Sequence, residues 1–404
     1  MLRGLPSSFR LILLLPAIFF AGCETVPSHP PVPITGDPVV DGNAQLAVAP
    51  AKDRALWEYR IAAAALRRNQ FDEAKAKLDD ALAVAAANYG QVNSEAAKSR
   101  RMFRNESDKP FIGEPYERVM ASFYRGILYW RDGEPDNARA LYRNGQLLDS
   151  DTQDKTYAGD YVLLDYLDGL VSAKLGGDGA DALARARANA RKQGHATPPD
   201  FNTKANVMIF AEYGRGPTKY QGGEYGEYLK FSVEKSKIRS ARLEVDGRQI
   251  ALPPYDDVSF QATTRGGRLM DHVLGNKAVF KQTTDTIGDV ALQGAVATSA
   301  FSQGRRNDEA ALALAAVGLI SKIASAATTP QADIRAWSNL PQYLSFATLQ
   351  LAIGEYTAKL EFIDGNGQVV PWLTQNFTIT VPPADSNIGG KAPDVVVFRS
   401  ELKN

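Results

Sequence analysis

Between residue 51 and about residue 200, apolar residues recur at the three- and four-residue spacing of an amphipathic α-helix. Three stretches combine small residues with aromatic residues or leucine: Phe71 to Ala81, Tyr124 to Gly145, and Leu167 to Ala186. Small residues let paired helices approach closely, as the helices of a tetratricopeptide repeat must. We therefore expect tetratricopeptide-like helical repeats over residues 51–200.

The spacing of these stretches departs from that of a regular array. Ala74 and Ala138 are 64 residues apart, and Ala138 and Ala182 are 44 apart, whereas the repeat has about 34 residues. The excess indicates an insertion at roughly 90–118 and a longer turn near 150–157. The insertion concentrates basic side chains, among them Arg100, Arg101 and Arg104. These residues form either a docking patch for an anionic surface or a solvated loop, and we favour the loop.

The predicted repeats place apolar side chains on their concave face, where such arrays bind partner peptides. In the second repeat these candidate partner-binding residues are Met120, Phe123, Ile127 and Trp130, and the third repeat adds Leu164, Leu167 and Val171. A face this apolar does not stand open to water in a soluble domain. It either holds an apolar peptide of a partner or is covered by the protein's own chain, and we favour the second.

After Pro198-Pro199 the period of the apolar residues changes. The run from Val207 to Glu212 is typical of a buried strand, and a last strand is expected at Val395–Phe398. Alternating segments at 241–245 and 356–362 are followed by the turns at 246–247 and 364–367, which predict hairpins. Six or seven short strands predict an antiparallel, β-sandwich-like domain over 201–404. The fold class is therefore α+β.

An Ala/Gly-rich segment interrupts the β-rich half. Residues 284–301 and 308–327 flank a polar turn and predict a helical hairpin inserted at about 284–327. Lys322 and two serines argue against insertion into a membrane. We expect a packed or oligomerising hairpin, because small residues let helices pack closely.

The N-terminus indicates export and lipidation. Residues 1–22 combine a basic start with an apolar run from Leu11 to Phe20, as a secretory signal peptide does. Phe20-Ala21-Gly22-Cys23 resembles the lipobox of bacterial lipoproteins, with Phe20 where Leu is usual. The resemblance implies acylation of Cys23 and, because Glu24 follows, anchoring to the periplasmic face of the outer membrane; a plain cleaved signal or a retained anchor is the alternative. Residues 23–50 would then form a lipidated, proline-rich tether that reaches roughly 80 Å.

Composition and failed motifs exclude several classes of function. Lys and Arg number 46, as do Asp and Glu, so the zero net charge argues against binding to nucleic acid. One Cys excludes internal disulfides, and the three histidines form no local metal-ligand motif. The glycine-rich stretch 214–219 lacks the spacing of a phosphate loop, and the turn at 364–367 lacks the Glu of a calcium loop. We expect no metal, no cofactor and no enzymatic activity.

Three further segments, at 113–118, 213–219 and 333–341, carry short motifs that are weak alone and become specific through their order along the chain. Their candidate motif residues are Gly113, Glu114, Tyr116, Glu117, Arg118, Gly214, Pro217, Lys219, Asp333, Arg335 and Trp337. With the lipobox, they resemble a poorly characterised family of bacterial tetratricopeptide-like lipoproteins, which implies a role in the cell envelope. The first segment also has the features of a helix start. For the last segment we favour a packed ion pair with an aromatic lid over a ligand site.

The sequence therefore predicts a non-catalytic adaptor or scaffold for unidentified envelope proteins. The helical half is the expected partner surface, and the lipid anchor is the contact with the membrane. Two alternatives stay open: a structural component that forms homo-oligomers through the 284–327 hairpin, and an envelope module that binds or hydrolyses carbohydrate.

Overall fold

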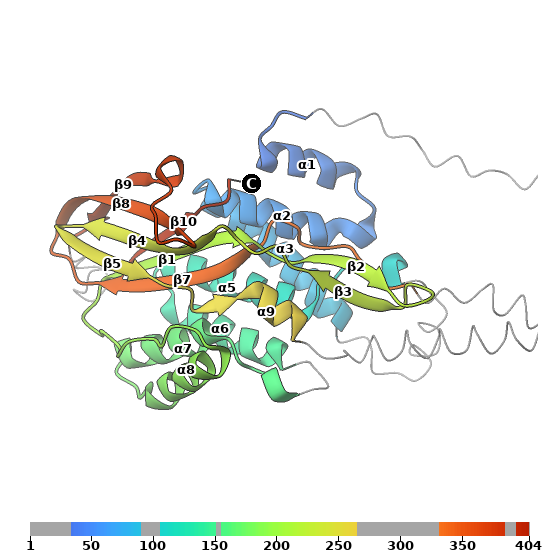
Figure 1. Cartoon of the computed structure of the whole chain (residues 1–404). Helices are drawn as coiled ribbons and strands as arrows, with labels where there is room; N and C mark the ends of the chain where they lie inside the picture. Colours follow the sequence, from blue (N-terminus) through green and yellow to red (C-terminus); the bar gives the residue numbers. More distant parts are fainter. Residues whose placement is uncertain (1–33, 90–105, 151–154, 265–330, 384–392, 404) are drawn as a thin grey trace, which may run out of the picture.

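The computed structural model describes residues 34–89, 106–150, 155–264, 331–383 and 393–403 (Figure 1). Helices make up the N-terminal part of the chain, and sheets make up most of the C-terminal part. The chain is therefore a mixed α+β protein, as the change in apolar period predicts. Four predicted features lie outside the described residues: the signal peptide, Cys23, the basic side chains Arg100, Arg101 and Arg104, and the hairpin at 284–327.

Consecutive helices pack in pairs. The helices are α1 (Pro38–Val48), α2 (Arg54–Arg67), α3 (Phe71–Tyr89), α5 (Pro115–Arg131), α6 (Pro135–Asp149), α7 (Val162–Lys174) and α8 (Ala180–Gln193). Helix α2 packs on α3, α5 on α6, and α7 on α8. Contacts between α3 and α5 and between α6 and α7 join the pairs into one array.

Glycines allow the close approach of these helices. A Cβ atom at Gly126 of α5 would lie 2.5 Å from Cε1 of Tyr142 on α6. A Cβ atom at Gly145 of α6 would lie 2.8 Å from Cδ1 of Leu164 on α7. Since real Cβ contacts are never this short, each crossing depends on the missing side chain. The expected close packing at small residues is thus confirmed.

Substituting Gly126→Val is expected to lower the free energy of unfolding by about 2 kcal/mol, because the buried Tyr142 ring must move to make room. Urea denaturation followed by circular dichroism measures the change. Gly365→Ala in an exposed turn is the matched control, since its new Cβ would meet only the Arg239 side chain at 3.7 Å. Equal losses for the two variants would contradict the packing argument.

The predicted tether is wrong over its C-terminal part. Residues Pro38–Val48 form α1, which Asp37 caps by accepting hydrogen bonds from the N–H groups of Val39 and Val40. Helix α1 packs against α2. The proline content was misleading because Pro38 occupies the first helical turn, where its missing N–H costs nothing. From Cys23 to Asp37 there are 14 residues, which span at most about 50 Å.

Two four-stranded sheets and a two-stranded ribbon form the C-terminal part. We call the sheet of order β10-β1-β7-β6 the inner sheet and the sheet of order β5-β4-β8-β9 the outer sheet; β2 and β3 form the ribbon. The strands are β1 (Val207–Arg215), β2 (Thr218–Gly222), β3 (Tyr228–Ser232), β4 (Ile238–Val245), β5 (Arg248–Leu252), β6 (Asp256–Asp257), β7 (Pro341–Leu349), β8 (Gly354–Asp364), β9 (Gln375–Val381) and β10 (Val395–Ser400). The short helix α9 (Val258–Thr263) follows β6.

The predicted strands at 207–212, 241–245, 356–362 and 395–398 are confirmed, and β4 and β5 form the expected hairpin. The purely antiparallel arrangement is wrong, because β10 pairs with β1 in parallel, Val395 opposite Val207. Strand β7, which pairs with β1 along most of its length, was not predicted. Its first six residues are all buried, so it lacks the alternation of a half-exposed strand.

Strand β1 contributes to two hydrophobic clusters. Its residues Met208 and Phe210 belong to a cluster with the helices, and Val207 and Ile209 belong to a cluster with the outer sheet. In Figure 1 the inner sheet accordingly lies between the helices and the outer sheet. The change of period near residue 201 separates helices from strands, but a single hydrophobic cluster joins the two parts.

Candidate functional site

The apolar helix face is covered by the protein's own inner sheet. Met120, Phe123, Ile127 and Trp130 are all buried, and so are Leu164, Leu167 and Val171. The Phe123 ring lies 6.0 Å from that of Phe210 on β1, and Trp130 Nε1 donates a hydrogen bond to Asp394 just before β10 (2.9 Å). Self-coverage, the favoured interpretation, is confirmed. The use of these side chains as a partner surface is wrong, because the sheet already occupies the face.

The three motif segments meet at one place between helices and sheets. Lys219 Nζ donates to Glu117 Oε2 at 2.6 Å and to the carbonyl oxygen of Arg335 at 2.9 Å. The other carboxylate oxygen of Glu117 accepts the backbone N–H of Trp337 at 2.7 Å. The side chains of Glu117 and Lys219 are 0 % and 1 % exposed. We call Glu117, Lys219, Arg335 and Trp337 the junction cluster.

Local sequence explains how Glu117 enters the junction cluster. Pro115 begins α5, and Glu117 closes a capping box by accepting the N–H of Glu114 at 2.6 Å. Gly113 turns the chain at φ +81°, and Arg118 donates to its carbonyl oxygen at 2.9 Å. The predicted helix start is confirmed, and one carboxylate both caps the helix and neutralises a distant lysine.

The second motif segment is the turn that carries Lys219 into the cluster. Gly214 adopts φ +75° near the end of β1, and its N–H donates to Glu401 at 2.9 Å. Pro217 is buried immediately before β2. Tyr116 of the first segment is also buried, and its ring packs edge-to-face against Phe231 on β3, with 5.8 Å between the ring centroids. These residues position Lys219 by packing.

Arg335 and Trp337 complete the junction cluster as a packed arrangement. The guanidinium of Arg335 lies 2.6 Å from Asp53, before α2, and 2.6 Å from Asp333. The Trp337 ring stacks on Tyr59 of α2 at 4.6 Å with an interplanar angle of 7°. The ion pair and its aromatic neighbour are those favoured from the sequence, and they connect the third segment to the helices.

A second buried ionic cluster was missed by the sequence analysis. Arg67 of α2 donates to Glu212 of β1 at 2.6 Å, with exposed side-chain fractions of 2 % and 1 %. The same carboxylate accepts from Tyr124 of α5 (2.5 Å) and Ser400 of β10 (2.7 Å). Burial, reinforced by the Glu212 charge, raises the pKa of the Tyr124 hydroxyl well above its usual value, so it remains a donor. The signal that the sequence offered for this cluster was Glu212, a charged residue at the end of the apolar run that begins at Val207.

Buried carboxylates also join the start of α7 to β6 and α9. Asp256 of β6 accepts the N–H groups of Val162 (2.7 Å) and Leu163 (2.9 Å) and thereby caps α7. Asp160 accepts from Gln261 of α9 at 2.9 Å. Burial raises the pKa of Asp256 to about 7 and that of Asp160 to about 6.

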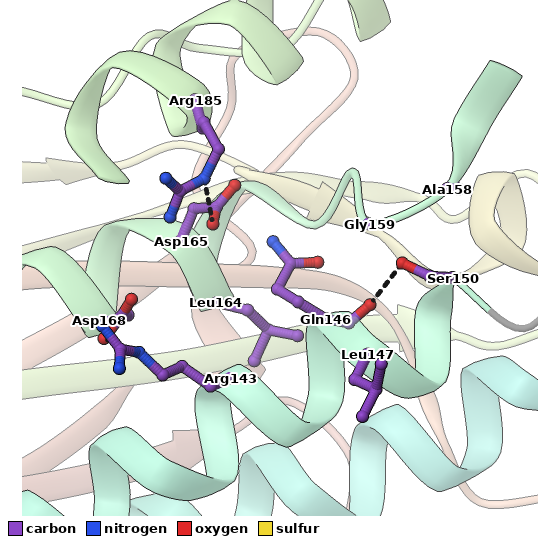
Figure 2. Close-up of a pocket in the computed structure, with 10 residues that line it drawn as sticks. All are labelled: Arg143, Gln146, Leu147, Ser150, Ala158, Gly159, Leu164, Asp165, Asp168 and Arg185. Atoms are coloured by element: carbon purple, nitrogen blue, oxygen red, sulfur yellow. Dashed lines mark hydrogen bonds and ion pairs between the residues drawn. The ribbon is translucent and has the colours of Figure 1, made fainter. Parts of the chain in front are cut away.

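An open hollow lies between α6, α7 and α8, with a volume of about 510 Å³. Figure 2 shows Asp165 beside Arg185 and Asp168 beside Arg143. Leu147, at the edge of the hollow, is 71 % exposed. We call this feature the α6–α8 hollow. Two aspartates three positions apart in the otherwise apolar α7 were the sequence signal for it.

Comparison with models of known families, with curated proteins and with solved structures yields no match. Within the described ranges, no group of three or more His, Cys, Asp or Glu side chains is placed to hold a metal ion. No helix in that part of the chain combines the length and the apolar character needed to cross a bilayer.

Proposed function

We propose that this protein is a non-catalytic, lipid-anchored scaffold of the cell envelope that faces the periplasm from the outer membrane. In this proposal the helix pairs are a tetratricopeptide-like array. The inner and outer sheets are a β-sandwich-like unit that closes its concave side. The body binds partner proteins through the outer side of the helical array.

The α6–α8 hollow is the observation that carries this proposal. Inner helices α2 and α5 contact β10, and α7 contacts β7, so these helices are occupied by the sheet. The hollow is lined mainly by residues of α6 and of the side of α7 turned toward it, with Arg185 from α8; it remains open and carries the exposed Leu147. A concave surface with an exposed apolar residue and flanking charges suits a docked protein segment.

The buried charges support a scaffold over an enzyme. Glu117, Lys219, Arg67 and Glu212 are held by groups from separate helices and strands. Such contacts tie the helical array to the sheets and hold the array in one shape. A rigid body of this kind, with at most about 50 Å of chain between a lipidated Cys23 and α1, would present its hollow close to the membrane.

Crosslinking and pull-down from detergent-solubilised membranes test the scaffold proposal, using a C-terminal tag on the full chain. We expect a stoichiometric partner with the wild-type chain and about tenfold less with Leu147→Glu, because the charge disrupts the apolar contact. Trp372→Glu is the matched control, since Trp372 is 80 % exposed on the strand-rich part. It should retain the partner.

Recovery of only the protein itself in all samples would contradict the scaffold proposal and favour self-assembly. Loss of partner in both variants would contradict the assignment to the α6–α8 hollow. In the same preparation, Cys23→Ser should abolish the incorporation of labelled palmitate into the chain; unchanged incorporation would contradict the lipid anchor.

A further inference from the structure

We propose that the α6–α8 hollow binds an acidic segment of a protein partner, with carboxylates on its arginines and an apolar side chain against Leu147. This inference rests on the scaffold proposal and names the chemistry of the partner. It derives from how the arginines around the hollow are bonded.

Two arginines that line the hollow, Arg143 and Arg185, and the neighbouring Arg139 are only partly used by the chain. Arg139 and Arg143 each donate through Nε to Asp168 Oδ1 at 2.9 Å, and Arg185 donates through Nε to Asp165 at 3.2 Å. Among the described residues, their terminal Nη atoms form no hydrogen bond. Arg143 and Arg185 are 59 % and 55 % exposed. Their guanidinium ends are therefore held in place and still available to donate.

The charge around the hollow favours an anion. With Arg139, which lies outside the lining, three arginines bond to the two aspartates, and Arg139 and Arg143 share one oxygen of Asp168. The aspartates are buried and orient the guanidinium groups from beneath. Burial raises the pKa of Asp165 to about 6, which weakens its competition for Arg185 as the pH falls. A guanidinium group that is held through Nε, with its Nη atoms still able to donate, suits the paired hydrogen bonds that a carboxylate accepts.

The apolar part of the hollow favours a peptide over a bare anion. Leu147 stands exposed on α6, and the buried Leu164 of α7 also lines the hollow. A partner segment with leucine next to glutamate would cover Leu147 while its carboxylate reaches Arg143 or Arg185. Burial of a leucine side chain on this surface would contribute more to the binding free energy than one exposed ion pair does, because an exposed ion pair alone adds little.

Fluorescence anisotropy with labelled peptides tests this inference on the full mature chain in detergent. The probe is a peptide of repeated Glu-Glu-Leu units, compared with one of Gln-Gln-Leu units. We expect the acidic peptide to bind about tenfold more tightly, and the double variant Arg143→Gln/Arg185→Gln to lose about tenfold in affinity for it. Arg248→Gln, in an exposed pair on the outer sheet, is the control and should bind as the wild type does.

Equal binding of the two peptides would overturn the inference, and so would no binding at about 1 mM. Because the double variant removes the arginine beside the buried Asp165 and one of the two arginines that bond Asp168, Arg143→Lys/Arg185→Lys provides a charge-preserving alternative. It should weaken the acidic peptide by losing the planar fork. Unchanged affinity in a folded lysine variant would contradict the carboxylate geometry.

The pull-down separates this inference from the scaffold proposal. A partner lost with Leu147→Glu but retained by both arginine variants would refute the acidic segment and leave the scaffold standing. A peptide that binds, with no partner recovered from membranes, would refute the scaffold alone. Displacement of the peptide by anionic phosphatidylglycerol vesicles, but not by neutral ones, would assign the arginines to lipid and overturn the inference.

Discussion

Replacing Lys219 by methionine is expected to lower the free energy of unfolding by about 3–5 kcal/mol, the range for breaking a buried ion pair. The Glu117 carboxylate would remain fully buried without the ammonium that lies 2.6 Å from it. The same change removes the hydrogen bond to the Arg335 carbonyl, which ties the third motif segment to β2. Urea denaturation, monitored by tryptophan fluorescence and by circular dichroism, measures the loss.

Two further variants isolate the cause. Lys359→Met removes a lysine from an exposed pair with Glu244 at 2.7 Å and is expected to cost less than about 1 kcal/mol. The double variant Glu117→Gln/Lys219→Met removes the uncompensated charge and should recover part of the stability. If Lys219→Met cost no more than Lys359→Met, the junction cluster would not join the helices to the sheets as described.

Lowering the pH from about 7.5 to 5 is expected to raise the free energy of unfolding by about 5 kcal/mol. The pKa of Asp256 is raised to about 7, and those of Asp160 and Asp165 to about 6, from the ordinary value of 3.8. Between 3.8 and these values the folded chain binds more protons than the unfolded chain. The free energy of unfolding therefore falls as the pH rises through this window, and the stabilisation is greatest at its acidic end.

Asp256 should make the largest single contribution to this pH dependence, about 2.5 kcal/mol. Denaturation curves at several pH values between 5 and 8 give the slope, and Asp256→Asn should flatten it. Asp246→Asn is the control, because Asp246 is exposed in the β4–β5 turn and its variant should keep the wild-type slope. A stability that rises from pH 5 to 7.5 would contradict the buried state of these carboxylates.

Local sequence patterns predicted a large part of this structure because they report on interactions between residues close together in the chain. Pro115 and Glu117 mark the start of α5 through the needs of its first turn. The Asp246-Gly247 turn between alternating segments produces the β4–β5 hairpin, and Gly126 permits the crossing of α5 and α6. Each of these predictions depends on residues that interact within one turn, one hairpin or one pair of helices.

The candidate sites were only partly visible in the sequence. The motif segments around Glu117, Lys219 and Trp337 were identified, but not their meeting point. Arg67 and Glu212 were missed because they are 145 residues apart and neither belongs to a motif. The α6–α8 hollow was missed for the same reason: Arg143, Asp168 and Arg185 come from three helices whose packing brings them together.

By itself, the sequence determined the division into a helical and a strand-rich part, the main hairpins and the small residues at helix crossings. Only the tertiary structure decided that the inner sheet covers the apolar helix face, that β10 joins β1 in parallel, and that residues 38–48 form a packed helix. The physical reason is that propensity and periodicity report on neighbours along the chain. Burial and charge neutralisation depend on segments that the fold brings together from far apart.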